Sequence, residues 1–169
     1  TNHDLDYVIA LNSSGLSVVE AVEPPNERDI GWGSTMPTQM FSYMKNFYPK
    51  YKSNDITKNI TILGPSFANT RDAAINLCSV FPSSGNYMDA GNVHDYSGRE
   101  PEGRYGGGWG IGLSDALDRQ KLGSSKPAWA SENGYKMSRS NTGHPAVTQR
   151  AAAKYLPRQF LSHLQHGAP

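Results

Sequence analysis

The chain has 169 residues, of which 37% are hydrophobic, and it contains 17 glycines and 11 prolines. This length fits one domain, and the composition suits many loops around short buried elements better than a helical bundle. Sixteen basic and fifteen acidic residues leave a net charge of +1, and without a basic run nucleic acid is not an expected partner. No apolar stretch approaches the roughly 20 residues that cross a bilayer, and the single cysteine, Cys78, excludes an internal disulfide.

The spacing of apolar residues predicts strands and helices that alternate along the chain. In chain order we expect a helix over 5–11, a strand over 16–22, a helix over 35–48, a strand over 60–64, a helix over 70–81, a strand over 87–96, a helix over 113–122, a strand over 127–132 and a helix over 145–166. Such alternation indicates a parallel sheet, either open or closed into a barrel.

The last helix is expected to turn an apolar face toward the core. The residues of that face are Val147, Ala151, Tyr155, Leu156, Phe160 and Leu164. His163 and His166 lie three residues apart near its end. A solvated helix end is favoured over a metal site there, because no third ligand lies nearby in the sequence.

Polar residues follow the predicted strands at their carboxyl ends. Pro24 and Pro25 end the first strand, so Glu27 lies on its rim, although a solvated turn would also explain this cluster. His94 and Tyr96 end the third strand, and Glu132 ends the fourth. Residues delivered to this edge by several strands are typical of active sites in barrels built from βα-loops.

Strict alternation along the fourth strand predicts that Ala128, Ala130 and Glu132 share one face, with Trp129 turned away into the core under a helix. Along the third strand, alternation groups Ala90, Asn92, His94 and Tyr96. Asp89 faces the other way and is interpreted as a structural partner in the helix layer.

Two glutamates, Glu27 and Glu132, lie at the rims of different parallel strands, 105 positions apart. Retaining glycoside hydrolysis uses such a pair, one as nucleophile and one as acid/base. At the residue level, EPPNERD (23–29) and ASENGY (130–135) resemble the fourth-strand Asn-Glu motif and the seventh-strand Glu motif of clan A glycoside hydrolases, which are TIM barrels. ILGPSF (62–67) and GNVHDY (91–96) resemble the fifth and sixth strands of those enzymes.

The resemblance implies a partial (β/α)8 TIM barrel over residues 1–169, a single domain that holds strands four to seven of the C-terminal half. It implies a retaining O-glycoside hydrolase that acts on a β-linked oligo- or polysaccharide by double displacement, without a cofactor or metal. Glu27 corresponds to the acid/base, Glu132 to the nucleophile and Asn26 to the amide that binds the sugar. His94 and Tyr96 would orient Glu132 or the sugar. The resemblance also favours a secreted or extracellular protein.

The glycine-rich stretch GRYGGGWGIG (103–112) lacks the spacing of phosphate-binding loops. Its aromatic residues Tyr105 and Trp109 are expected either to stack on a pyranose, which makes Trp109 a substrate-binding candidate, or to pack on the barrel rim. Glu23 is interpreted as a substrate contact or a rim salt bridge.

Two alternatives to an active enzyme stay open. The chain could be a carbohydrate-binding barrel that has lost turnover, or a barrel fragment that is inactive alone. Four parallel strands leave two open sheet edges, which would also allow self-association.

Overall fold

The computed structural model describes residues 2–16, 18–96, 112–137 and 146–168. Its helices are α1 (Asn2–Leu11), α2 (Asp29–Trp32), α3 (Met36–Lys52), α4 (Thr70–Val80), α5 (Leu113–Gln120) and α6 (Gln149–Gln165), and its strands are β1 (Ala21–Val22), β2 (Thr61–Ile62), β3 (Gly91–Asp95) and β4 (Ala128–Asn133). Every strand and helix expected from the sequence is present, so that prediction is confirmed. The first three strands are shorter than expected, and the one-turn helix α2 was not predicted.

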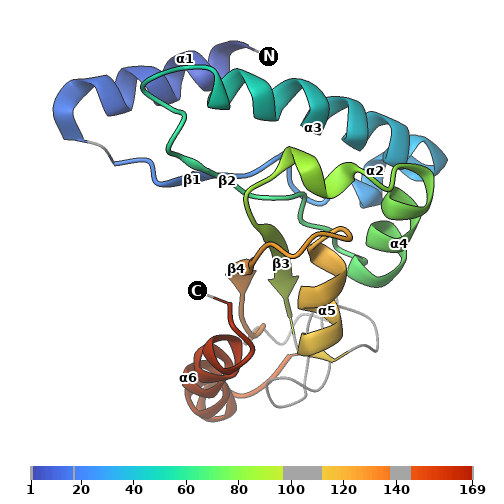
Figure 1. The fold of residues 1–169 in the computed structure, drawn as a ribbon. Helices are drawn as coiled ribbons and strands as arrows, with labels where there is room; N and C mark the ends of the chain where they lie inside the picture. Colours follow the sequence, from blue (N-terminus) through green and yellow to red (C-terminus); the bar gives the residue numbers. More distant parts are fainter. Residues whose placement is uncertain (1, 17, 97–111, 138–145, 169) are drawn as a thin grey trace.

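The strands pair in parallel, in two sheets of two strands. Residues 21–22 of β1 pair with residues 61–62 of β2, and β3 pairs with β4 from Gly91 to Asp95. An isolated parallel bridge between Leu63 and Ala90 links β2 to β3. Figure 1 shows α1 and α3 along the side of β1 and β2, with α5 and α6 beside β3 and β4.

The predicted partial TIM barrel is wrong. Within the described residues the strands form only the two two-stranded sheets, and no closed barrel is present. β1 and β2 each contribute two paired residues. Closing a barrel takes strands that tilt and stagger around a complete ring, and four strands this short form an open α/β arrangement instead.

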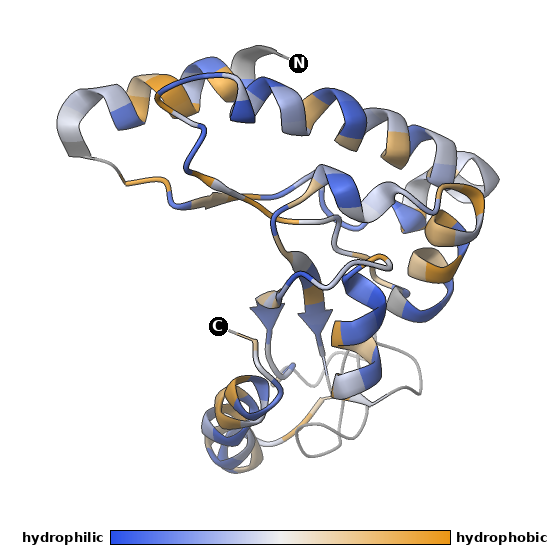
Figure 2. Ribbon diagram, in the orientation of Figure 1, coloured by the Kyte–Doolittle hydropathy of each residue, from blue (hydrophilic) through white to orange (hydrophobic). Residues whose placement is uncertain are grey.

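The core is divided among helix and strand contacts. In α3, Met36, Met40 and Met44 recur at every fourth residue and are buried against Leu77 of α4. Around β3, Val93 packs with residues of α5 and β4. Figure 2 shows that β3 and β4 change from apolar starts to hydrophilic carboxyl ends. None of the described helices has the length and hydropathy needed to cross a membrane.

The predicted apolar face of α6 is also wrong. Leu156, Phe160 and Leu164 are exposed, whereas Gln159 and His163 are buried. The cause is Asp95, whose side chain is fully buried between β3 and α6. The Gln159 side chain donates to the Asp95 backbone oxygen at 2.9 Å and to its carboxylate at 3.0 Å, and His163 Nε2 lies 2.9 Å from the same carboxylate. A buried carboxylate needs such donors, so the polar face of α6 turns inward and His163 is not at a solvated helix end.

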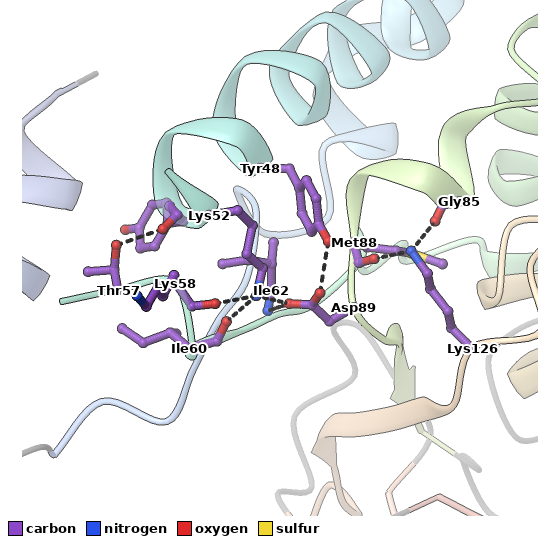
Figure 3. A network of polar contacts seen from close by, with 11 residues as sticks. Tyr48, Lys52, Thr57, Lys58, Ile60, Ile62, Gly85, Met88, Asp89 and Lys126 are labelled. Atoms are coloured by element: carbon purple, nitrogen blue, oxygen red, sulfur yellow. Dashed lines mark hydrogen bonds and ion pairs between the residues drawn. The ribbon is translucent and has the colours of Figure 1, made fainter. Parts of the chain in front are cut away.

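Asp89 joins α3 to the strands, as its predicted structural role requires (Figure 3). Its carboxylate accepts hydrogen bonds from the Tyr48 hydroxyl at 3.0 Å and from the Ile62 backbone N–H at 2.8 Å. Lys52 Nζ lies 2.6 Å from the same group. Burial raises the pKa of Asp89, but the bonds from Lys52, Ile62 and Tyr48 together outweigh burial and leave that pKa below its ordinary value.

We predict that Asp89→Asn lowers the free energy of unfolding by about 2 kcal/mol at pH 7, because it removes a charged, hydrogen-bonded acceptor. Because the pKa of Asp89 is lower in the folded than in the unfolded protein, its carboxylate stabilises the fold at pH values above the unfolded-state pKa, roughly 3.9. This stabilisation is lost as the pH falls through the folded-state pKa. The gap between wild type and variant should therefore shrink between pH 5 and pH 3 in urea unfolding. Asp55→Asn is the matched control, since the Asp55 side chain is 94% exposed. An Asp89→Asn gap that stays constant with pH would contradict this role.

Candidate active site

Glu27 lies in the short loop that leaves the carboxyl end of β1. Pro24 and Pro25 follow the strand almost directly and lack the backbone N–H that pairing would need. Glu27 has a φ of +45°, a left-handed conformation that residues with a side chain seldom adopt. Such strain persists only where the surrounding structure fixes it, and it is concentrated at functional sites.

The loop that carries Glu27 is anchored through Asp29, the first residue of α2. The Asp29 carboxylate accepts hydrogen bonds from the backbone N–H groups of Ala68 at 3.0 Å and Asn69 at 2.7 Å. Both N–H groups belong to the segment between β2 and α4. Two charge-assisted bonds thus hold the loop after β1 against the loop after β2.

Side chains from the loop after β1 and from β4 meet at one nitrogen atom of a β3 side chain. Nδ1 of His94 lies 2.9 Å from Oε1 of Glu27 and 2.8 Å from Oε2 of Glu132. The side chain of His94 is 2% exposed, against 24% for Glu27 and 46% for Glu132. Because ionised carboxylates only accept hydrogen bonds, Nδ1 must be the protonated nitrogen when it bonds to them. Nε2 is buried and has no hydrogen-bond partner among the described residues.

Tyr96 completes the group from the end of β3. It hydrogen-bonds to Glu132, and its pKa is raised to about 12 by burial, by that hydrogen bond and by the charges of Glu132 and Glu27. The phenol therefore stays protonated over the whole neutral range. It therefore acts as a hydrogen-bond donor to Glu132.

The sequence-predicted site residues divide into three sets. Glu27, His94, Tyr96 and Glu132 come together. Asn26 is exposed next to Glu27, and its side chain makes no hydrogen bond to this group among the described residues. Trp109, like Tyr105, lies outside the described residues.

The predicted faces of β4 require a correction. Ala128 and Ala130 pack with Val93 on the helix side of the sheet, whereas Glu132 pairs with His94. The register pairs Trp129 with Asn92, so Trp129 leaves the same face as the site residues and is not core under a helix. The cause is a β-bulge: Val93 pairs with Ala130 and His94 with Glu132, which leaves Ser131 as an extra residue.

Below the carboxyl pair, Glu23 forms a hydrogen-bonded group that sequence reasoning missed. Oε2 of Glu23 accepts hydrogen bonds from the Asn92 amide at 2.7 Å and the Ser131 hydroxyl at 2.8 Å. Among the described residues Glu23 forms no salt bridge, so the rim salt bridge expected as one possibility is not found there. β2 lies between β1 and β3, since it pairs with β1 and is bridged to β3, so these hydrogen bonds tie the end of β1 to β3 and β4 across β2.

One donor atom from each of Glu27, His94 and Glu132 lies within 4.8 Å of the others, close enough to hold a metal ion. The same distances describe two carboxyl groups bridged by Nδ1 of His94 without a metal. A chelator separates the two cases experimentally.

The strain at Glu27 gives a stability prediction. Replacement by glycine or by alanine removes the carboxylate equally, but only glycine adopts a positive φ freely. We expect Glu27→Gly to be more stable than Glu27→Ala by about 1 kcal/mol in urea unfolding.

Arg28 provides the control for this comparison, since its φ of −71° is ordinary helical backbone. There the order should reverse, with Arg28→Ala more stable than Arg28→Gly. Alanine at position 27 matching or exceeding glycine would contradict the strain.

Comparison with known proteins gives one structural likeness. No protein-family model matches the sequence, and no curated protein matches it. A crystal structure of an endo-laminarinase from Formosa Hel1_33_131 is similar to 96% of this chain and 51% of that chain, at 16% identity and a TM-score of 0.57. The chain thus spans about half the length of that enzyme. At this identity the likeness concerns the fold alone.

Proposed function

We propose that the chain is a retaining glycoside hydrolase domain in which Glu27 and Glu132 carry out the reaction. The observation that carries the proposal is the meeting of both carboxylates at Nδ1 of His94, with carboxylate oxygens within 4.8 Å of each other. Retaining enzymes hold their carboxyl groups about 5–5.5 Å apart, and inverting enzymes hold them about 6.5–9.5 Å apart. The short separation supports retention.

The two carboxyl groups have different surroundings, and these assign their roles. Tyr96 donates a hydrogen bond to Glu132, and such a bond suits a nucleophile that reacts as the carboxylate, so we assign Glu132 as the nucleophile. Glu27 is then the acid/base, which supplies the proton that the leaving group needs. His94 orients both, since its ring is almost completely buried.

The reaction takes two displacements. The Glu132 carboxylate attacks the anomeric carbon, the glycosidic C–O bond breaks, and the proton of Glu27 passes to the leaving oxygen. The sugar is then an ester of Glu132. Glu27, now a carboxylate, takes a proton from water as that water attacks the anomeric carbon and Glu132 leaves. Two inversions give net retention, and the sum is the consumption of one water.

The proposed substrate is a β-linked glucan polysaccharide. The similar fold of an endo-laminarinase supports this class, and the half-exposed Glu132 lies where a chain could reach it.

Incubation of the purified chain with laminarin tests the proposal. We expect new reducing ends, first released as the β-anomer in proton NMR, and the same rate with EDTA present. The α-anomer would contradict retention, loss of activity with EDTA would favour a metal site, and glucan binding without hydrolysis would favour a non-catalytic protein.

A further inference from the structure

We infer that Glu23, Asn92 and Ser131 form a positioning network that fixes the β-bulge of β4 and so directs Glu132 into the site. This inference rests on the proposed function for its kinetic consequences. Its structural part, a side-chain network that holds one bulge residue, stands on the hydrogen bonds alone.

The bulge decides which way Glu132 points. From Gly91 to Val93, β3 pairs residue by residue with Ala128 to Ala130 of β4. Without the extra residue, His94 would pair with Ser131, and Glu132 would fall opposite Asp95, whose side chain lies on the α6 side. The skipped Ser131 brings Glu132 opposite His94 instead. Glu132 reaches the face that carries His94 only because the bulge exists.

A bulge leaves its extra residue without a ladder partner, and here side chains supply the partners. The Ser131 backbone N–H donates to Oδ1 of Asn92 at 3.2 Å. Its hydroxyl donates to Oε2 of Glu23 at 2.8 Å. The backbone N–H and the hydroxyl of the extra residue are therefore held from the neighbouring strand β3 and from the end of β1.

Asn92 is the centre of the network and is fully buried. Its Oδ1 accepts from Ser131, and its Nδ2 donates to Glu23 at 2.7 Å. The opposite amide orientation would face NH₂ with an N–H donor and oxygen with a carboxylate, so only one orientation satisfies both neighbours. Glu23 fixes that orientation and acts on Glu132 through Asn92 and Ser131.

A misplacement of about 1 Å at a reacting group can lower the rate roughly 10²-fold. We therefore expect Glu23→Ala to lower kcat at least about tenfold while KM stays within about twofold. Glu23→Gln keeps an oxygen that accepts both bonds, so its kcat should stay within a few-fold of wild type. Glu20→Ala, which removes an exposed carboxylate before β1, is the matched control and should change neither constant.

A donor–acceptor exchange tests the direction of the Asn92 bond. Asn92→Asp turns a second carboxylate oxygen toward Glu23 and should lower kcat. Adding Glu23→Gln restores a donor opposite that oxygen and should recover most of the loss. If Asn92→Asp does not fold, the exposed Glu23 variants still decide the question, because they leave the buried amide in place.

Amide hydrogen exchange at Ser131 tests the network independently of any enzyme activity. The Ser131 N–H should exchange at least about tenfold faster in Glu23→Ala than in wild type, and at the wild-type rate in Glu20→Ala. If neither wild type nor the variants hydrolyse glucan, but the Ser131 N–H still exchanges faster in Glu23→Ala, the proposed function fails and the bulge network stands. Unchanged exchange together with unchanged kcat would overturn the network. A raised KM with unchanged kcat would overturn it too, because Glu23 would then be a substrate contact.

Discussion

Glu132→Gln should lower turnover of β-glucan by a factor on the order of 10³ or more, because an amide cannot form the glycosyl ester. The free energy of unfolding should change by less than about 0.5 kcal/mol, since the side chain is 46% exposed and glutamine conserves its shape. Kinetics with laminarin and urea unfolding of the same preparation measure the two effects together.

Glu20→Gln is the control for this change, because it neutralises another exposed carboxylate outside the site. It should retain full activity. Wild-type turnover by Glu132→Gln would remove Glu132 from the mechanism, and an equal loss in both variants would point to a general charge effect.

The second large effect concerns Glu27 and depends on the leaving group. In a Glu27→Ala variant, which lacks the acid, hydrolysis of natural glucan should fall about 10²–10⁴-fold. An aryl β-glucoside with a good leaving group needs no proton, so it should still glycosylate Glu132 quickly. The second step lacks its base, and azide should accelerate it by forming a glycosyl azide.

This experiment is best run in both Glu27→Ala and Glu27→Gly. The two variants differ in backbone strain but not in the missing carboxyl group, so their leaving-group dependence should agree even though their stabilities differ. Equal losses on aryl and natural substrates would show that Glu27 is not the acid/base.

Much of the site could be predicted because parallel strands present their carboxyl ends at one edge. Glu27, His94 and Glu132 each follow or end an apolar strand, and the structure brings them to a common nitrogen. The alternation argument failed at Ser131, because a single extra residue reverses the face of everything after it. The sequence carries no local mark of that bulge, whose partners Glu23 and Asn92 lie 108 and 39 residues away.

The last helix shows a different limit. Its apolar spacing favoured Leu156 and Phe160 as the inner face, but those residues are exposed and Gln159 is buried. The buried carboxylate of Asp95 decides which face of the helix turns inward. The apolar spacing within the helix carries no information about this partner, which lies 64 residues from Gln159 in the sequence. The partial barrel was likewise inferred from polar residues at the strand ends, which an open parallel sheet can also supply.

Covalent trapping tests the central claim most directly. An activated 2-deoxy-2-fluoro β-glucoside forms the glycosyl ester quickly and releases it slowly, so the labelled carboxyl group can be located by peptide mass spectrometry. We predict one added sugar per chain, on Glu132, and none in Glu132→Gln. A label on Glu27 or Glu23, or glucan hydrolysis with no labelled carboxyl group, would contradict the account.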